Sequence, residues 1–111
     1  MTRTILTGDD VTLDITLTDA DGAAVDLSGA EITWGAATSS IGDPALTKTR
    51  SGGGVTVTDA TGGVIEVTLG AADTGALSRG RYYHEVQVVD DNGLTTTFVP
   101  DAIEVAATVI D

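Results

Sequence analysis

The stretch Val11-Thr12-Leu13-Asp14-Ile15-Thr16-Leu17-Thr18 decides the fold, because apolar and polar residues alternate strictly along it. A period of two places the apolar side chains on one face of an extended strand and the polar side chains on the other. Such a strand packs one face against a core and turns the other to water. The stretch therefore predicts a half-buried antiparallel strand.

Similar strand signals recur along the chain, separated by segments rich in Gly, Asp and Asn. We expect further extended segments at 24–27, 31–37, 45–50, 55–59, 64–69, 81–90, 94–99 and around Ile103 and Val105. A loop is expected from Ser39 to Pro44, one helical turn within 70–78, and a break at Pro100-Asp101. About seven to nine short strands with this spacing of turns predict an all-β fold, an immunoglobulin-like antiparallel β-sandwich. The length favours a single domain over residues 1–111.

Composition and charge exclude several classes of function. The chain has 19 Thr and 14 Gly but one Lys and one Met, which favours strands and turns over helices. Seventeen acidic against five basic residues give a formal net charge of -12, which disfavours binding to nucleic acid or to an anionic membrane surface. No cysteine is present, so disulfide and thiolate chemistry are excluded. No signal peptide or membrane-spanning segment is expected.

Two stretches carry a family resemblance. The first is Val25-Asp26-Leu27-Ser28-Gly29-Ala30-Glu31-Ile32, and the second is Gly80-Arg81-Tyr82-Tyr83-His84-Glu85-Val86-Gln87-Val88, followed by Asp91-Asn92-Gly93 and Thr97-Phe98-Val99-Pro100. Together they resemble the immunoglobulin-like domain at the start of phage baseplate upper proteins and in related tailed-phage structural proteins. The resemblance implies a virion protein, assembled in the host cytoplasm, with no active site. Larger family members continue into further domains, so ending at Asp111 favours a small accessory protein.

Four residues are candidates for structural roles. Trp34 is the natural centre of a core that has few other aromatic residues. Leu77, Gly80 and Tyr82 have the spacing of a tyrosine corner, in which the Tyr hydroxyl bonds to backbone just upstream. We expect this corner to fix the crossover into the long strand.

His84 is the single histidine and therefore the first candidate for a catalytic base. Nucleophilic catalysis holds a Ser or Cys beside such a base, but no Ser of this chain lies in a nucleophile-elbow motif. His84 also shares a face with Tyr82 and Val86 in the predicted long strand. We expect a hydrogen-bonded residue at the edge of the core, with no enzyme activity and no cofactor.

Two acidic segments, Asp19-Ala20-Asp21-Gly22 and Asp90-Asp91-Asn92-Gly93, resemble the opening of a calcium-binding loop. An EF-hand needs a bidentate Glu at its twelfth position, whereas the twelfth position from Asp19 is Ala30. Asp, Asn and Gly are also the ordinary residues of tight turns. We expect turns and no metal site, with calcium held between converging acidic loops as the alternative. One His and no Cys exclude a zinc site.

The basic residues include the candidate docking contacts Lys48, Arg50, Arg79 and Arg81. If the two pairs lie at the same end of the sandwich, they form a cationic spot on an acidic body. Such a spot orients a docked partner. The alternative is a set of local ion pairs, each of which contributes little.

Taken with the lack of a nucleophile–base motif, the family resemblance implies a non-enzymatic structural component of a tailed-phage virion, most simply a capsid decoration or cement protein. Its partners would be the major capsid protein or neck and tail proteins, with several copies in a homo-oligomer or on a lattice. A neck, tail or baseplate accessory protein is the alternative within this class. A carbohydrate- or receptor-binding module is the alternative from another class, and it would need exposed aromatic residues such as Tyr83 and Phe98.

Overall fold

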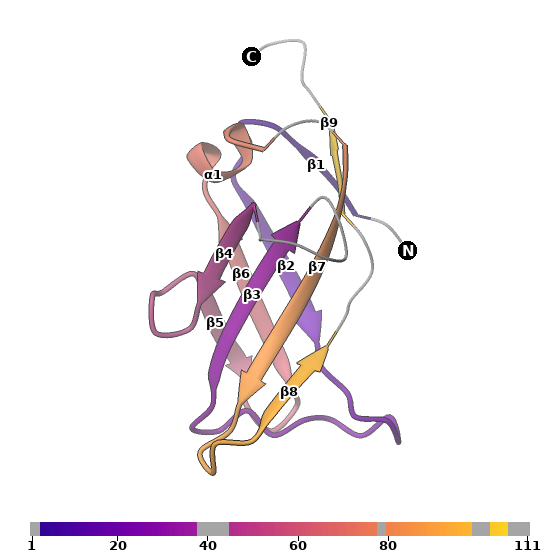
Figure 1. The fold of residues 1–111 in the computed structure, drawn as a ribbon, viewed down its shortest axis with the longest axis vertical. Coiled ribbons are helices and arrows are strands. Elements are labelled where there is room, and N and C mark those ends of the chain that lie inside the picture. Colours follow the sequence, from indigo (N-terminus) through magenta and orange to yellow (C-terminus); the bar gives the residue numbers. More distant parts are fainter. Residues whose placement is uncertain (1–2, 38–44, 78–79, 99–102, 107–111) are drawn as a thin grey trace.

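The computed structural model describes residues 3–37, 45–77, 80–98 and 103–106. Within these ranges the chain forms nine strands and one short helix. The strands are β1 (Arg3–Leu6), β2 (Val11–Thr16), β3 (Glu31–Ala37), β4 (Leu46–Thr49), β5 (Val55–Asp59), β6 (Val64–Leu69), β7 (Gly80–Val89), β8 (Thr95–Phe98) and β9 (Ile103–Ala106). The helix, α1 (Ala71–Gly75), connects β6 to β7 at one end of the molecule (Figure 1).

Two sheets pack against each other and form a sandwich (Figure 1). The smaller sheet has the order β2-β6-β5, with antiparallel neighbours. The larger sheet has the order β1-β9-β7-β3-β4, with β8 also paired to β7. Its pairs are antiparallel except for β1 with β9, which run parallel. The predicted all-β antiparallel sandwich is confirmed, while its immunoglobulin type stays a finer prediction.

The core lies between the sheets and contains Trp34 of β3, which is 0% exposed. The alternation in β2 has the predicted consequence, since Leu13 and Ile15 are buried while Thr12 and Asp14 are exposed. Removing these apolar side chains from water is the main favourable contribution to folding. The deciding stretch of sequence thus contributes β2 to the inner face of the smaller sheet.

The boundaries of several elements agree with the sequence. The hairpin of β5 and β6, the helical turn α1, and the strands β3, β7 and β8 fall where they are predicted. β2 ends at Thr16 and continues as a single bridge between Thr18 and Ala24, and the rest of the segment 24–27 forms no strand. The loop predicted from Ser39 to Pro44 and the break at Pro100-Asp101 lie outside the described residues.

β1 is an element that the alternation does not predict. Ile5 is buried, but the neighbouring Leu6 is 40% exposed, so apolar residues do not mark one face. β1 forms because it pairs with β9, from Arg3 opposite Ile103 to Leu6 opposite Ala106. This contact joins segments at opposite ends of the sequence.

One edge of β7 is shared by two strands. Residues 80–82 of β7 pair with β9, whereas residues 86–89 pair with β8. β1 then pairs with the outer edge of β9. Along β8, among the described residues, no strand follows on that outer side.

Candidate functional site

His84 is engaged in the core. It is 6% exposed, and its Nδ1 accepts a hydrogen bond from Trp34 Nε1 at 3.0 Å. The two rings meet edge to face, with centroids 6.1 Å apart and an interplanar angle of 71°. The expected buried, hydrogen-bonded histidine is therefore present. The bond between this ring nitrogen and the indole joins β7 to its neighbouring strand β3.

The two acidic segments form turns closed by their own carboxylates. Asp19 Oδ1 accepts hydrogen bonds from the backbone N–H groups of Asp21 and Ala23. Asp90 Oδ1 does the same for Asn92 and Leu94. Asp stabilises turns in this way when it bonds to backbone a few residues ahead. Among residues that the structure describes, no group of three or more metal-ligating side chains comes together.

Lys48 is part of a local ion pair. Its Nζ lies 2.9 Å from Asp73 Oδ2, and the same oxygen accepts from the Gly70 N–H. Lys48 first, and Gly70 second, hold the pKa of Asp73 below its ordinary value of 3.8. Lys48 therefore links β4 to the start of α1.

The other candidate docking residues lie in different surroundings. Arg50 Nη1 donates to the carbonyl oxygens of Leu27 and Ala30 at 3.1 and 2.9 Å, so it holds the turn before β3. Arg81 is exposed on β7, and Arg79 lies outside the described residues.

The pairing registers separate Lys48 from Arg81. Lys48 pairs with Trp34, and Trp34 pairs with Val86 of β7, so Lys48 is level with Val86. Five strand residues from Val86 back to Arg81 correspond to about 16 Å at roughly 3.3 Å per residue. The structure therefore does not gather Lys48 and Arg81 into one cationic spot. A docking role for these residues stays a prediction.

The predicted tyrosine corner has its three residues in suitable places. Leu77 and Tyr82 are buried at 9% and 3% exposure, on either side of the crossover into β7. Gly80 has a φ of 147°, a conformation that residues with a Cβ rarely adopt. The hydroxyl bond that defines the corner stays a prediction.

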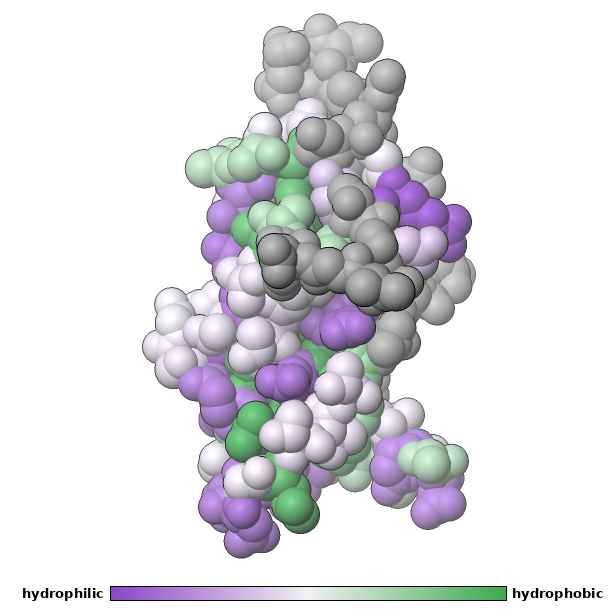
Figure 2. All heavy atoms as spheres, viewed as in Figure 1, coloured by the Kyte–Doolittle hydropathy of each residue, from purple (hydrophilic) through white to green (hydrophobic). Residues whose placement is uncertain are grey.

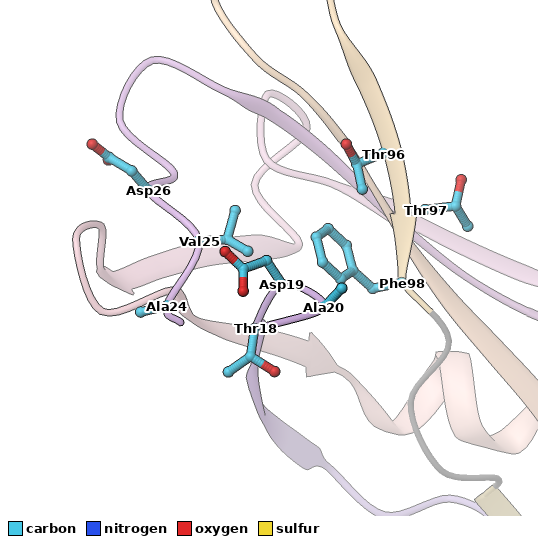
Figure 3. A pocket seen from close by; sticks show the side chains of 9 residues that line it. All are labelled: Thr18, Asp19, Ala20, Ala24, Val25, Asp26, Thr96, Thr97 and Phe98. Atoms are coloured by element: carbon cyan, nitrogen blue, oxygen red, sulfur yellow. The ribbon is translucent and has the colours of Figure 1, made fainter. Parts of the chain in front are cut away.

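A groove lies between β8 and the segment 18–26. Its volume is about 630 Å³, and it is lined by Thr18, Asp19, Ala20, Ala24, Val25, Asp26, Thr96, Thr97 and Phe98. The Phe98 ring projects from β8 toward the segment that carries Ala20 and Val25 (Figure 3). The sequence patterns described above do not predict this site. The signal in the sequence is a Phe next to three Thr in a predicted strand, together with a segment of small residues after the first alternating strand.

The wall of the groove opposite β8 is fixed to the rest of the sandwich. The Leu17 N–H donates to the Gly63 carbonyl at 2.8 Å, and the Leu27 N–H donates to Ala60 at 2.9 Å. Gly63 has a φ of 71°, and a Cβ there would lie 2.5 Å from the Leu17 carbonyl oxygen. This close approach requires glycine and holds the segment against the β5–β6 turn.

Comparison of the sequence with protein-family models and with curated proteins finds no match. The function is therefore inferred from the residues and their geometry.

The surface on one side of the molecule is mixed in character. Figure 2 shows hydrophobic residues on this side as several separate areas among hydrophilic and neutral ones. The large hydrophobic side chains that are exposed in the described part are Leu6, Tyr83 and Leu94, which lie on β1, on β7 and before β8. No helix in that part is long and apolar enough to cross a membrane.

Proposed function

We propose that this protein is a non-enzymatic structural component of a tailed-phage virion, most simply a decoration or cement protein on the capsid shell. The observation that carries this proposal is that several side chains of the types that serve catalysis or ligand binding are engaged in bonds that hold the fold. His84 bonds to Trp34, Lys48 to Asp73, and Asp19 to its own turn. Groups that hold the scaffold in this way support attachment better than catalysis, and the family resemblance supplies the phage assignment.

The surface of the protein is large enough to contact several neighbours at once. The accessible surface of 6308 Å² is several times the roughly 800 Å² that one partner covers in a standard interface. One face can therefore contact the shell while others contact neighbouring copies. Copies repeated on a lattice bind more firmly than a single contact does, because each later contact is intramolecular. The net charge of -12 keeps the surface that no partner covers well hydrated.

The experiment that tests the proposal is quantitative peptide counting in particles purified from the source, relative to the major shell protein. We expect a ratio comparable to that of the shell subunit. A small ring-like multiple would instead place the protein in the neck, tail or baseplate. Absence from the particles would overturn the virion proposal and favour a free binding module.

A carbohydrate-binding module has weaker support, because its aromatic platform is missing from the described surface. Trp34 is fully buried, Tyr83 is 42% exposed on the outer face of β7, and Phe98 is half-buried in the groove. We expect Tyr83→Ala to leave the amount of protein on particles within about twofold, since one exposed side chain is seldom essential to an interface. A glycan-array signal that Tyr83→Ala abolishes would support the rival instead.

A further inference from the structure

The edges of the two sheets differ in how they are protected. β4 carries Lys48, β2 carries Asp14, and the pairing of β5 is interrupted by a bulge between Val57 and Asp59. Charges and bulges on an edge strand hinder pairing with another chain. β8 has none of these devices, since Thr95–Phe98 contains no charge or proline and pairs with β7 without a register shift. β8 pairs with β7 alone and has no strand on its outer edge as far as the described residues go.

The core-facing side of β8 is also incompletely covered. Phe98 pairs with Val86 and Thr96 with Val88, so both lie on the side of the sheet that faces the core. Val86 and Val88 are buried there, but Thr96 is exposed and Phe98 is only half-buried. Figure 3 shows Thr96 and Phe98 on the same side of the strand, facing the segment 18–26, with Thr97 on the other side. In the part of the chain that the structure describes, the groove is thus a place where the sandwich has an inner face and no strand covers it.

The fold already uses an added strand beside this position. β1 pairs with the outer edge of β9, and β9 and β8 share the same edge of β7. A strand on the outer edge of β8 would therefore occupy the equivalent place further along the sheet. Its side chains would alternate, with every second one directed into the groove. Main-chain bonds and alternate side-chain pockets are the two parts of recognition by strand addition.

The charge of the groove indicates what kind of strand it would take. Asp19 and Asp26 lie in its lining, and both carboxylates are held by backbone N–H groups of their own turns. The Ser28 backbone N–H first, then the Ser28 hydroxyl, lower the pKa of Asp26 from its ordinary value of 3.8. Both are acidic residues, and they belong to a chain whose formal net charge is -12. A second copy would bring the same excess of negative charge, whereas a basic segment would be attracted.

We propose that the groove binds an extended, lysine- or arginine-bearing segment of a different protein, which adds a strand to β8 and places an apolar side chain over Phe98. The proposed attachment role supplies the biological setting on which this inference rests. The groove adds the chemistry of the partner to that role. The binding itself is a property of the isolated protein. It is therefore measurable without particles.

The test titrates the full chain, labelled with ¹⁵N, with the end-blocked peptide Lys-Thr-Val-Thr-Val-Thr-Lys. In an extended peptide its Val and Lys side chains share one face, as the apolar and acidic lining of the groove requires. We expect amide shifts concentrated in residues 95–98 and 18–26, with saturation below about 1 mM. The analogue with Glu in place of both Lys should bind at least about fivefold more weakly. Its two charges would be repelled by the acidic lining of the groove, whereas the Lys side chains are attracted.

Matched variants separate edge pairing from general charge. Thr96→Lys places a cation on the inner side of β8, where it blocks an added strand, and should weaken peptide binding by about tenfold or more. Thr56→Lys makes the same change at an exposed position on β5 and should leave binding within about twofold. Both variants should melt within a few degrees of the parent, since both positions are exposed.

Three results would overturn the proposal. The first is the absence of saturable shifts at 1 mM, or shifts confined to β2, β4 or β5. The second is equal affinity for the Lys and Glu peptides. The third is a dimer in sedimentation equilibrium that Thr96→Lys dissociates, which would assign the groove to a second copy. Peptide counting in particles is independent of all three, so failure of the groove and failure of the virion role are distinguishable.

Discussion

The two ends of the sandwich use their polar groups in different ways. At the α1 end the bonds join segments far apart in sequence, since Asp10 Oδ1 accepts from the Ala71 N–H across 61 residues. The Thr74 hydroxyl likewise donates to the Asp9 carbonyl at 2.7 Å across 65 residues. At the opposite end, four Asp carboxylates bond within four residues, inside their own turns (Figure 1). These carboxylates are Asp19, Asp26, Asp59 and Asp90.

The difference separates tertiary support from local support. A bond between distant segments helps to hold the fold, because breaking it leaves a buried polar group without a hydrogen-bond partner. A bond within one turn mainly fixes that turn. We therefore expect substitutions at the α1 end to lower global stability more than equivalent substitutions in the acidic turns. Three substitutions test this ranking, from the largest expected effect to the smallest.

The largest effect is expected for Thr74→Val, which removes the hydroxyl bond to Asp9 and keeps the shape of the side chain. Thr74 is 0% exposed, so the lost bond is not replaced by water at no cost. We expect the free energy of unfolding to fall by about 1–3 kcal/mol, measured by urea denaturation at pH 7. Thr74→Ser keeps the hydroxyl and should lose less. A loss below about 0.5 kcal/mol for Thr74→Val would show that the α1 end is not held by this bond.

An intermediate, pH-dependent effect is expected for Asp73→Asn. The pKa of Asp73 is lower in the folded protein than its ordinary value of 3.8, so its charge stabilises the fold above that pH. The contribution is lost as pH falls through the folded pKa. At pH 7 we expect Asp73→Asn to lower the free energy of unfolding by about 0.5–1 kcal/mol.

The difference between Asp73→Asn and the parent should shrink when the urea titration is repeated at pH 3. Using the difference cancels the general effect of protonating an acidic protein. Asp14→Asn, at an exposed position on β2, serves as the charge control and should differ little from the parent at either pH. A difference that stays constant from pH 7 to pH 3 would contradict the role of the Lys48–Asp73 pair.

The smallest effect is expected in the acidic turns. Asp19→Ala removes the acceptor for two turn N–H groups, but both are exposed and can bond to water, so the loss should be about 0.5 kcal/mol or less. Asp19→Asn keeps an acceptor oxygen and should be closer still to the parent. Amide hydrogen exchange at Asp21 and Ala23 should be faster than in the parent for Asp19→Ala but not for Asp19→Asn. A global loss as large as that of Thr74→Val would break the comparison between the two ends.

The same distinction explains which parts of the fold are predictable from sequence. The strand β2 and the acidic turns are encoded by neighbours, as the alternation from Val11 and the position of Asp19 show. β1 is not, because its partner β9 is about one hundred positions away. Its own residues, with both Ile5 and Leu6 apolar, specify no face.

The candidate site was less predictable than the fold. The engagement of His84 in a hydrogen bond could be expected from its place on an apolar face. The roles of Lys48 and Arg50 could not, since their partners Asp73 and Leu27 are more than twenty positions away in sequence. The groove at Phe98 lies beside β8, which within the described ranges pairs on one side only, with β7. The residues of β8 themselves do not indicate how many strands pair with it.

The parallel pairing of β1 with β9 also has a mechanical consequence. The two strands run in the same direction, with Arg3 opposite Ile103 and Leu6 opposite Ala106. Tension applied between residue 3 and residue 106 pulls the two strands past each other along their length. The evenly spaced bonds of a parallel ladder then share the force instead of opening one after another. A pull that separates these two residues therefore loads the β1–β9 contact in its most resistant direction.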